Sequence, residues 1–308
     1  MTDLRFDGRV AIVTGAGGNP GLGRAYAHLL AERGARVVVN DLGVGPDGRG
    51  IRRAHADVVV QEILDAGGDA VADTRSVSEL EQAALIVQTA LETWGRVDVL
   101  INNAGVSNLA RFDEIAPQDI ERTVNVHLFG TIWMCRAAWP HMQQAGYGRI
   151  VNITSGSMLG NLYSGVYGAA KGGIFALTRS LALDGAEHGI AVNSLMPAAY
   201  TAAMDHFLED SEWKEQAAAQ TPDWVAPVAV YLAHESFPLT GACLAARSGR
   251  IWETLITETK GIEAEHPTVE SVAEALEQIR DRTDLVENTP QLQAGRRNYS
   301  PKPYEAPV

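Results

Sequence analysis

The segment Thr14-Gly15-Ala16-Gly17-Gly18-Asn19-Pro20-Gly21-Leu22-Gly23 joins an apolar, β-rich run from Arg9 to Thr14 to a helical pattern from about Gly21 to Arg33. Glycines at such a junction let the backbone approach a pyrophosphate, and the helix N-terminus adds N–H groups and a positive dipole end. A tight turn without a ligand is the alternative for a glycine loop taken alone. The strand–loop–helix context favours a dinucleotide site that includes Gly15, Gly17, Gly21, Leu22 and Gly23.

The same alternation of strand and helix continues along the chain. Further strands are expected at Arg36–Asn40, Ala70–Asp73, Val97–Ile101, Arg149–Thr154, Ile190–Leu195 and Leu239–Ala245. Helical patterns lie between them at about 50–66, Ser78–Trp94, Pro117–Gln144 and Val166–Glu187. This order predicts an α/β fold with a doubly wound parallel sheet of the Rossmann type, whose strand ends form a ligand-binding edge.

No linker interrupts the alternation, so we expect a single domain over residues 1–245, with a substrate lid at about 198–222. Residues 246–308 are expected to form a C-terminal extension that packs on the core or on a partner subunit. Within the extension, Val269–Arg280 has a helical pattern, and the tail after Thr289 contains prolines and is expected to be extended.

Composition excludes several classes of protein. The 308 residues carry 25 Lys+Arg against 38 Asp+Glu, a net charge of −13, without the basic balance or stripe of a nucleic-acid binder. Two cysteines and scattered histidines predict neither a disulfide framework nor a metal site. There is no membrane-length apolar run, signal peptide or C-terminal address, so a reduced cytoplasm is the expected location.

Asp41 ends the second predicted strand. A carboxylate at this position accepts hydrogen bonds from the adenosine ribose hydroxyls and repels a 2′-phosphate, which favours NAD over NADP. The alternative is that Asp41 caps the loop that follows. Arg24 and Arg36 complicate the choice, since either could reach a phosphate.

Tyr167 and Lys171 stand four residues apart in a helical pattern, so their side chains share one face. A nearby ammonium favours the tyrosinate and can lower the phenol pKa toward a value useful for proton transfer. The chain has only four lysines, which weighs against a chance pairing, the alternative reading. Ser155, at the end of the fifth predicted strand, could donate a hydrogen bond to a reacting carbonyl or could simply cap its loop.

Together these features resemble the short-chain dehydrogenase/reductase family. The matching pieces are the glycine loop, Asn102-Asn103-Ala104-Gly105, Asn125, the Ser155 region, Tyr167 with Lys171, and Pro197 with Thr201. A closer resemblance, through Val37–Gly43, His234-Glu235-Ser236 and Gly249–Thr254, is to the (3R)-hydroxyacyl-CoA dehydrogenase unit of multifunctional enzyme type 2. The resemblance implies a stand-alone bacterial relative of that unit.

The resemblance implies hydride transfer between NAD and a secondary alcohol or ketone. By position, Tyr167 is the general acid/base, Ser155 orients the substrate oxygen, Lys171 tunes the tyrosine and holds the nicotinamide ribose, and Asn125 anchors a water in the proton relay. The implied cofactor contacts also include Ser76, Val77, Asn103, Ala104, Gly105, Pro197 and Thr201.

The chain departs from the family pattern at four places. The glycine loop is two residues longer than usual, with Asn19 and Pro20 the extra residues, and Arg75 stands where the family has an Asp near adenine. Ser155 and Tyr167 are twelve residues apart, one fewer than usual, so Thr154 is an alternative to Ser155 as the orienting hydroxyl. Ala198 replaces the customary glycine after Pro197.

A 3-hydroxyacyl-CoA with a lipid or steroid side chain is the expected substrate. Leu159, Leu162, Tyr163 and the stretch Ala198–Trp213 are expected to wall an apolar pocket, with Met204, Phe207 and Leu208 at helical spacing, although ordinary core packing explains that spacing equally well. Arg247 and Arg250 are candidates for contacting CoA phosphates, or are members of surface ion pairs.

Two other functions stay open: a dehydrogenase of free hydroxysteroids or other free alcohols, and a non-catalytic NAD-binding sensor or scaffold. The family also implies a homodimer or homotetramer through long helices, from among Ser78–Trp94, Pro117–Gln144 and Tyr167–Glu187. Neither a nucleic acid nor a membrane is expected as a partner.

Overall fold

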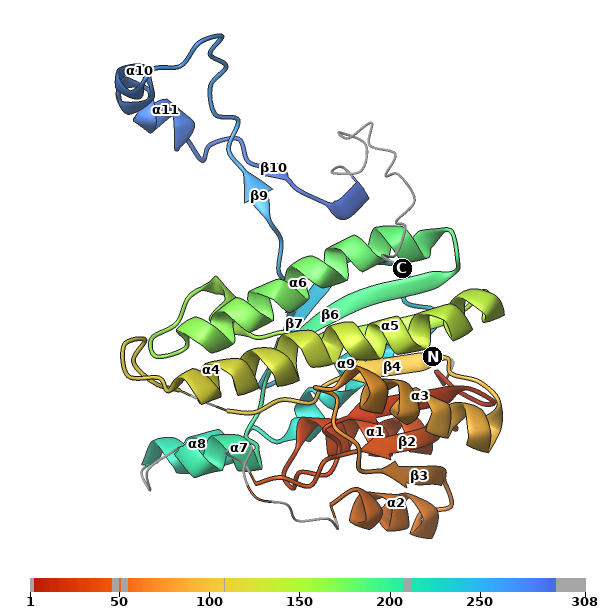
Figure 1. Ribbon diagram of the computed structural model, residues 1–308. Coiled ribbons are helices and arrows are strands. Elements are labelled where there is room, and N and C mark those ends of the chain that lie inside the picture. Colours follow the sequence, from red (N-terminus) through yellow and green to blue (C-terminus); the bar gives the residue numbers. More distant parts are fainter. Residues whose placement is uncertain (1–2, 46–49, 51–54, 108, 208–211, 292–308) are drawn as a thin grey trace, which may run out of the picture. The chain divides into compact units, whose positions relative to one another are not determined.

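The computed structural model describes residues 3–45, 50, 55–107, 109–207 and 212–291 (Figure 1). The chain divides into two compact units, Met1–Glu253 and Thr254–Val308. We describe each unit by itself.

The first unit is built on an eight-stranded sheet with the order β3-β2-β1-β4-β5-β6-β7-β8. The first seven strands in this order are parallel and β8 is antiparallel. Their bounds are β1(Val10–Thr14), β2(Arg36–Asn40), β3(Asp69–Asp73), β4(Val99–Asn102), β5(Gly148–Ile153), β6(Ile190–Ala198), β7(Cys243–Arg247) and β8(Arg250–Glu253). The predicted doubly wound parallel sheet is confirmed, and its order reverses between β1 and β4, where such sheets bind ligands.

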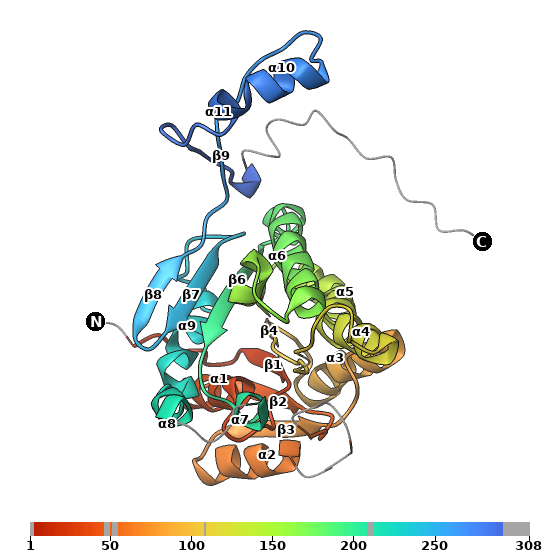
Figure 2. The same ribbon diagram turned by 90° about the vertical axis from the view of Figure 1, so that its left-hand side faces the viewer.

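Helices cover both faces of this sheet (Figure 2). One core joins alternate strand residues such as Val13 to α1(Leu22–Glu32), α2(His55–Asp65) and α9(Ala226–Leu232). The other joins residues such as Ile12 to α3(Leu80–Trp94), α5(Gly130–Ala145) and α6(Gly165–Ala186). Because strand side chains alternate between faces, each buried strand supplies both cores, which explains its continuous apolar sequence.

The long helix expected over Pro117–Gln144 is interrupted. It consists of α4(Pro117–Val124), a π-helical turn η1(Asn125–Phe129) and α5. A π turn adds a residue to the helical turn and redirects the side chains around it, and such turns are frequent at functional sites.

The seventh strand starts later than expected and is followed by an eighth that the sequence did not predict. β7 and β8 form a hairpin whose connecting residues, Ser248 and Gly249, have φ values of 48° and 78°. Positive φ at both central residues is the geometry of a tight hairpin turn that suits the strand twist. Strand pairing therefore continues to Glu253, eight residues beyond the boundary at 245 expected from sequence.

Short elements complete the first unit: η2(Gly156–Leu159), α7(Ala202–Phe207), α8(Glu212–Ala218) and η3(Pro222–Trp224). The second unit contains the antiparallel pair β9(Thr257–Glu258) and β10(Val286–Glu287), with α10(Val269–Glu274) and α11(Leu276–Ile279). Reciprocal hydrogen bonds between Thr268 and Ser271 cap the start of α10. The helix expected over Val269–Arg280 is divided at Ala275.

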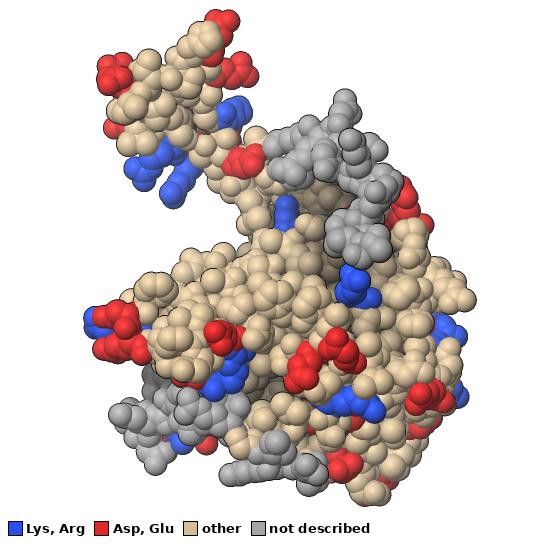
Figure 3. All heavy atoms as spheres, in the orientation of Figure 1, with Lys and Arg blue, Asp and Glu red and all other residues tan. Residues whose placement is uncertain are grey.

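Charges are mixed on the face drawn in Figure 3, where Lys and Arg side chains of the described residues stand among Asp and Glu side chains. Within the described part of the chain, no helix is both long and apolar enough to cross a lipid bilayer.

Candidate active site

A cleft with a volume of about 1270 Å³ lies at the carboxyl ends of the parallel strands. Its walls come from the glycine loop after β1, the ends of β2, β4, β5 and β6, the loop after β3, and α6 and α7. The predicted residues on its walls are Gly15, Gly17, Gly21, Leu22, Asp41, Ser76, Val77, Asn103, Ala104, Gly105, Tyr167, Lys171, Pro197 and Thr201. This volume exceeds the roughly 300–1,000 Å³ of a typical single-ligand pocket.

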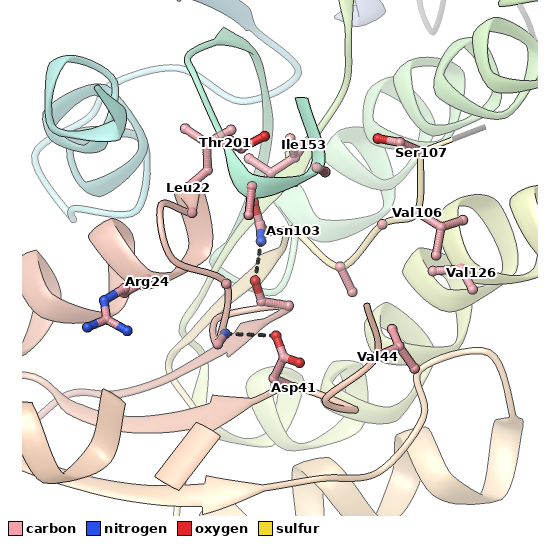
Figure 4. A pocket seen from close by; sticks show the side chains of 18 of the residues that line it. Leu22, Arg24, Asp41, Val44, Asn103, Val106, Ser107, Val126, Ile153 and Thr201 are labelled. Atoms are coloured by element: carbon pink, nitrogen blue, oxygen red, sulfur yellow. Dashed lines mark hydrogen bonds between the residues drawn. The ribbon is translucent and has the colours of Figure 1, made fainter. Parts of the chain in front are cut away.

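The glycine loop packs so closely on its surroundings that side chains are excluded. A Cβ at Gly15, where φ is 63°, would lie 2.7 Å from the Cα of Ala104. A Cβ at Gly23 would lie 2.5 Å from the carbonyl oxygen of Gly15, so Gly23 lets α1 pack directly against the loop. Gly23 is not among the residues that line the cleft. The Nδ2 of Asn103 donates to the carbonyls of Thr14 and Gly15 at 2.9 Å and fixes the loop; Figure 4 shows one of these two bonds.

The two extra loop residues are accommodated at the mouth of the cleft. Asn19 and Pro20 both line it, and the carbonyl of Pro20 accepts a hydrogen bond from the amide of Ala202 at 2.9 Å. Ala202 begins α7, so the insertion connects the glycine loop to the segment expected to act as a lid.

Asp41 faces the glycine loop at the end of β2 (Figure 4). Its Oδ2 accepts from the amide of Gly17 at 2.7 Å, and its Oδ1 accepts from the amide of Gly43 at 2.8 Å. The carboxylate therefore caps the following loop, and it also lies on the cleft wall, where the ribose-binding reading requires it to be. Each oxygen keeps a further lone pair for a ligand hydroxyl.

Three of the described arginines around the first strands of the sheet are paired with acids. Arg24 pairs with Glu62 and points away from Asp41 in Figure 4. Arg36 lies 3.5 Å from Asp69 and is not on the cleft wall. Arg24 and Arg75 both line the cleft, and the guanidinium of Arg75 is bound by the buried Asp73 and by Thr89.

Tyr167 and Lys171 face the same cleft from the first turns of α6. Lys171 is 3% exposed, its Nζ donates to the carbonyl of Ile153 at 2.6 Å, and it lies 5.7 Å from the centre of the Tyr167 ring. One helical turn thus brings a phenol and an amine together over the end of β5.

Burial dominates the electrostatics of this pair. It lowers the pKa of Lys171 to about 7. It also raises the pKa of Tyr167, against a hydrogen bond from Ser155 that lowers it. The sequence argument expected a lowered tyrosine pKa, and the direction is opposite, because removing the phenolate from water outweighs the hydrogen bond from Ser155.

Ser155, at the start of η2, is the hydroxyl that meets Tyr167. Its Oγ also accepts from the amide of Ser157 at 3.2 Å. The hydroxyl of Thr154 instead donates to the carbonyl of Leu195 at 3.0 Å and is buried. Thr154 lines the cleft and Ser155 does not, but Ser155 is the one that is hydrogen-bonded to Tyr167, which favours it as the orienting hydroxyl.

The structure does not bring Asn125 into this group. Asn125 is exposed and does not line the cleft, whereas His127, two residues later, is 3% exposed and does. Residues two apart on a helix lie on opposite sides, so the two side chains cannot share the cleft. The ring of His127 meets that of Tyr167 edge-on, with centres 5.1 Å apart and planes at 82°. Sequence reasoning missed His127 and also Arg122, which lines the cleft and pairs with Asp119 at 2.6 Å.

The expected substrate wall is exposed and apolar. Leu159, Leu162 and Tyr163 are exposed, and Phe112, which sequence reasoning missed, would lie 3.5 Å from a Cβ on Gly165. The amide of Ala110 donates to the carbonyl of Tyr163 at 3.0 Å and links the two loops that carry these side chains. We call the four exposed side chains the apolar rim; none of them is among the residues that line the cleft.

Other substrate candidates divide between the cleft and its surroundings. Met204 lines the cleft; the side chains of Phe207 and Trp213, and Leu208 as a whole, lie outside the described part. Arg247 lines the cleft, whereas Arg250 stacks on the ring of Trp252 at 4.9 Å. Among the residues the structure describes, no cluster of three or more His, Cys, Asp or Glu could hold a metal ion.

Comparisons with known proteins agree with this geometry. A family model described as short chain dehydrogenase matches residues 9–213. Peroxisomal multifunctional enzyme type 2 of Drosophila melanogaster is 41% identical over 259 residues, which cover 84% of this chain and 42% of that protein. The chain thus spans less than half the length of that relative.

A second relative is matched over nearly its whole length. The short-chain type dehydrogenase/reductase Rv0148 of Mycobacterium tuberculosis is 40% identical over 275 residues, 89% of this chain and 94% of that protein. Among solved structures, a 7α-hydroxysteroid dehydrogenase complexed with NADH and 7-oxo glycochenodeoxycholic acid is similar with a TM-score of 0.71 at 29% identity, over 80% of this chain and 95% of that one.

Proposed function

The chain belongs to the short-chain dehydrogenase family, and from this premise we propose that it transfers a hydride between NAD and a secondary alcohol or ketone. The observation that carries the proposal is the placement of Tyr167 and Lys171 on one wall of a cleft whose other wall is the glycine loop. A scaffold that merely bound the nucleotide would have no need of an acid/base pair there.

The residues present fit a dinucleotide. The glycine loop offers a backbone surface that a Cβ would block, with the first turn of α1 behind it. Asp41 would hold the adenosine ribose, Ser76, Val77, Asn103, Ala104 and Gly105 would line the adenosine side, and Pro197 and Thr201 would meet the nicotinamide end. The chemistry that a bound nicotinamide supplies is hydride transfer.

The protein's part in the reaction is positioning and proton transfer. In alcohol oxidation Tyr167 takes the hydroxyl proton, and in ketone reduction it returns it. Ser155 holds the substrate oxygen beside the phenol, and Lys171 stabilises the tyrosinate when its amine is charged.

NAD rather than NADP is the proposed cofactor, because Asp41 is fixed by two amides and, among the residues that the structure describes, Arg24 and Arg75 on this side of the cleft are already paired with acids. The Asp41→Ala variant should lower the ratio of kcat/KM for NAD to that for NADP by about tenfold or more, since it removes both the ribose acceptor and the charge that repels a 2′-phosphate. Steady-state kinetics with the two cofactors measures this ratio.

Asp57→Ala is the matched control for this measurement, because Asp57 is an exposed acid in the first turn of α2 and its loss changes the net charge equally. An unchanged ratio in Asp41→Ala, or an equal change in both variants, contradicts the assignment.

A 3-hydroxyacyl-CoA with a lipid or steroid side chain is the proposed substrate. The multifunctional enzyme relatives, the apolar rim of Phe112, Leu159, Leu162 and Tyr163, and the position of Arg247 on the cleft wall support it. The 7α-hydroxysteroid dehydrogenase likeness supports a second candidate, a free hydroxysteroid.

A screen of NAD reduction across 3-hydroxyacyl-CoAs, hydroxysteroids and simple secondary alcohols tests both. Faster turnover of free hydroxysteroids than of acyl-CoAs rejects the first candidate. NADH binding without turnover of any alcohol rejects the enzyme itself and supports a sensor.

We also propose a homodimer or homotetramer formed through long helices, as the family implies. Phe129 stacks on Trp133 with ring centres 5.6 Å apart and is partly exposed at the start of α5, which supports a contact there. Sedimentation equilibrium at the mass of a single chain would contradict this proposal.

A further inference from the structure

His127 is a buried polar side chain that the proposed reaction leaves without a task. It lies in the π turn between α4 and α5 and on the wall of the cleft. Gly105 makes room for it, since a Cβ there would lie 2.4 Å from Cε1 of the imidazole. The ring is therefore held between the loop after β4 and Tyr167 on α6.

One nitrogen of the ring is already engaged. Nε2 lies 2.8 Å from the carbonyl oxygen of Val106 and 3.1 Å from its amide nitrogen. When Nε2 carries the proton it donates to the carbonyl of Val106, and when it does not it accepts from the amide of Val106. Either tautomer therefore makes a hydrogen bond here. This contact ties the loop after β4 to the π turn η1.

The other nitrogen, Nδ1, is buried and has no hydrogen-bond partner among the residues that the structure describes. Leaving a buried polar atom unpaired costs about 1–3 kcal/mol. Since His127 lines the cleft, a molecule in the cleft can supply the missing partner. Such a molecule would stand next to the phenol of Tyr167.

Burial and the nearby Lys171 lower the pKa of His127 to about 3, so the ring is uncharged near neutral pH. A neutral imidazole can hold a water or a hydroxyl without adding a positive charge that would oppose protonation of Lys171. It can do so as donor or acceptor, according to the tautomer set at Val106.

We propose, on the basis of the function proposed above, that His127 is a positioning residue for proton transfer at Tyr167, with Nδ1 holding a water or substrate hydroxyl beside the phenol. The competing role is structural, in which Nε2 clamps Val106 and Nδ1 does nothing.

Three substitutions separate the two roles. In His127→Asn the amide takes the place of Nδ1, in His127→Gln it takes the place of Nε2, and in His127→Phe the ring remains without nitrogens. The Asn variant should keep most of the wild-type kcat and have a lower Tm, because it loses the bond to Val106. The Gln and Phe variants should lose about tenfold or more in kcat, the equivalent of one hydrogen bond, with KM nearly unchanged.

Two readouts support the kinetics. Fluorescence titration should give the same NADH affinity for all four proteins, and the solvent deuterium isotope effect on kcat should rise in the Gln and Phe variants as proton transfer becomes slower. Two outcomes overturn the role of Nδ1. One is a high kcat in His127→Gln together with a low kcat in His127→Asn. The other is an equal loss of kcat in all three variants with no change in the solvent isotope effect. Failure of the wild-type chain to turn over any alcohol is a separate result, which rejects the proposed function instead.

Discussion

The Tyr167→Phe variant should lose about 10³-fold in kcat and still bind NADH, because the substitution removes the only atom that exchanges the proton and keeps the ring. The ring packs edge-on against His127, so Phe preserves the shape of the cleft wall. Turnover of the best alcohol from the screen measures the loss, and fluorescence titration with NADH measures binding.

Tyr231→Phe serves as the control for this change. Tyr231 is on α9, away from the cleft wall, and its ring packs edge-on against Phe237 at 5.2 Å. It should retain full activity. Normal turnover by Tyr167→Phe would remove the phenol from the reaction and leave the nucleotide site as the only supported feature.

The Lys171→Met variant should lose about 100-fold or more in kcat, because it removes the charge that stabilises the tyrosinate. Its stability should change in a pH-dependent way. The pKa of Lys171 is about 7 in the folded chain against an ordinary value of 10.5 in the unfolded chain, so between these pH values the unfolded chain binds a proton that the folded chain does not. Unfolding of the wild type therefore becomes harder as pH rises through this window, by up to about 1.4 kcal/mol per pH unit from this group.

Methionine has no proton to bind, so the variant lacks this contribution. The stability of Lys171→Met relative to the wild type should be greatest below pH 7 and should decline steadily toward pH 10. Urea unfolding at a series of pH values measures the difference. Lys260→Met is the control, since Lys260 is an exposed partner of Asp284, and its curve should run parallel to that of the wild type. Parallel curves for Lys171→Met as well would show that the amine is not held in a low-dielectric site.

The fold could be predicted because its signals are local and repeated. The glycine loop and the alternation of strand and helix determine a parallel sheet, and the spacing of Tyr167 and Lys171 determines that they share a face. The eighth strand was missed although Ser248-Gly249 is a typical hairpin-turn pair, because the short run after it was assigned to the extension.

The site could be predicted only where the type of a residue and its spacing along the sequence were enough to place its side chain in the cleft. Asn125 matched a family pattern by residue type, but the direction of a side chain around a helix with a π turn depends on packing. His127 carried no sequence signal of its own within an apolar stretch. The raised pKa of Tyr167 is likewise a product of burial in the finished structure, which residue spacing cannot reveal.

Any shortened version of the protein should keep the hairpin of β7 and β8 whole. A chain that stopped after Ala245 would lose the last two residues of β7, including Arg247 on the cleft wall, and all of β8. It would leave part of the β6 edge and all of the β7 edge open, and an open apolar strand edge invites pairing between molecules. A chain that stopped after Glu253 would retain every strand of the sheet, which makes residue 253 the place to cut for crystallisation or for testing what the rest of the chain contributes.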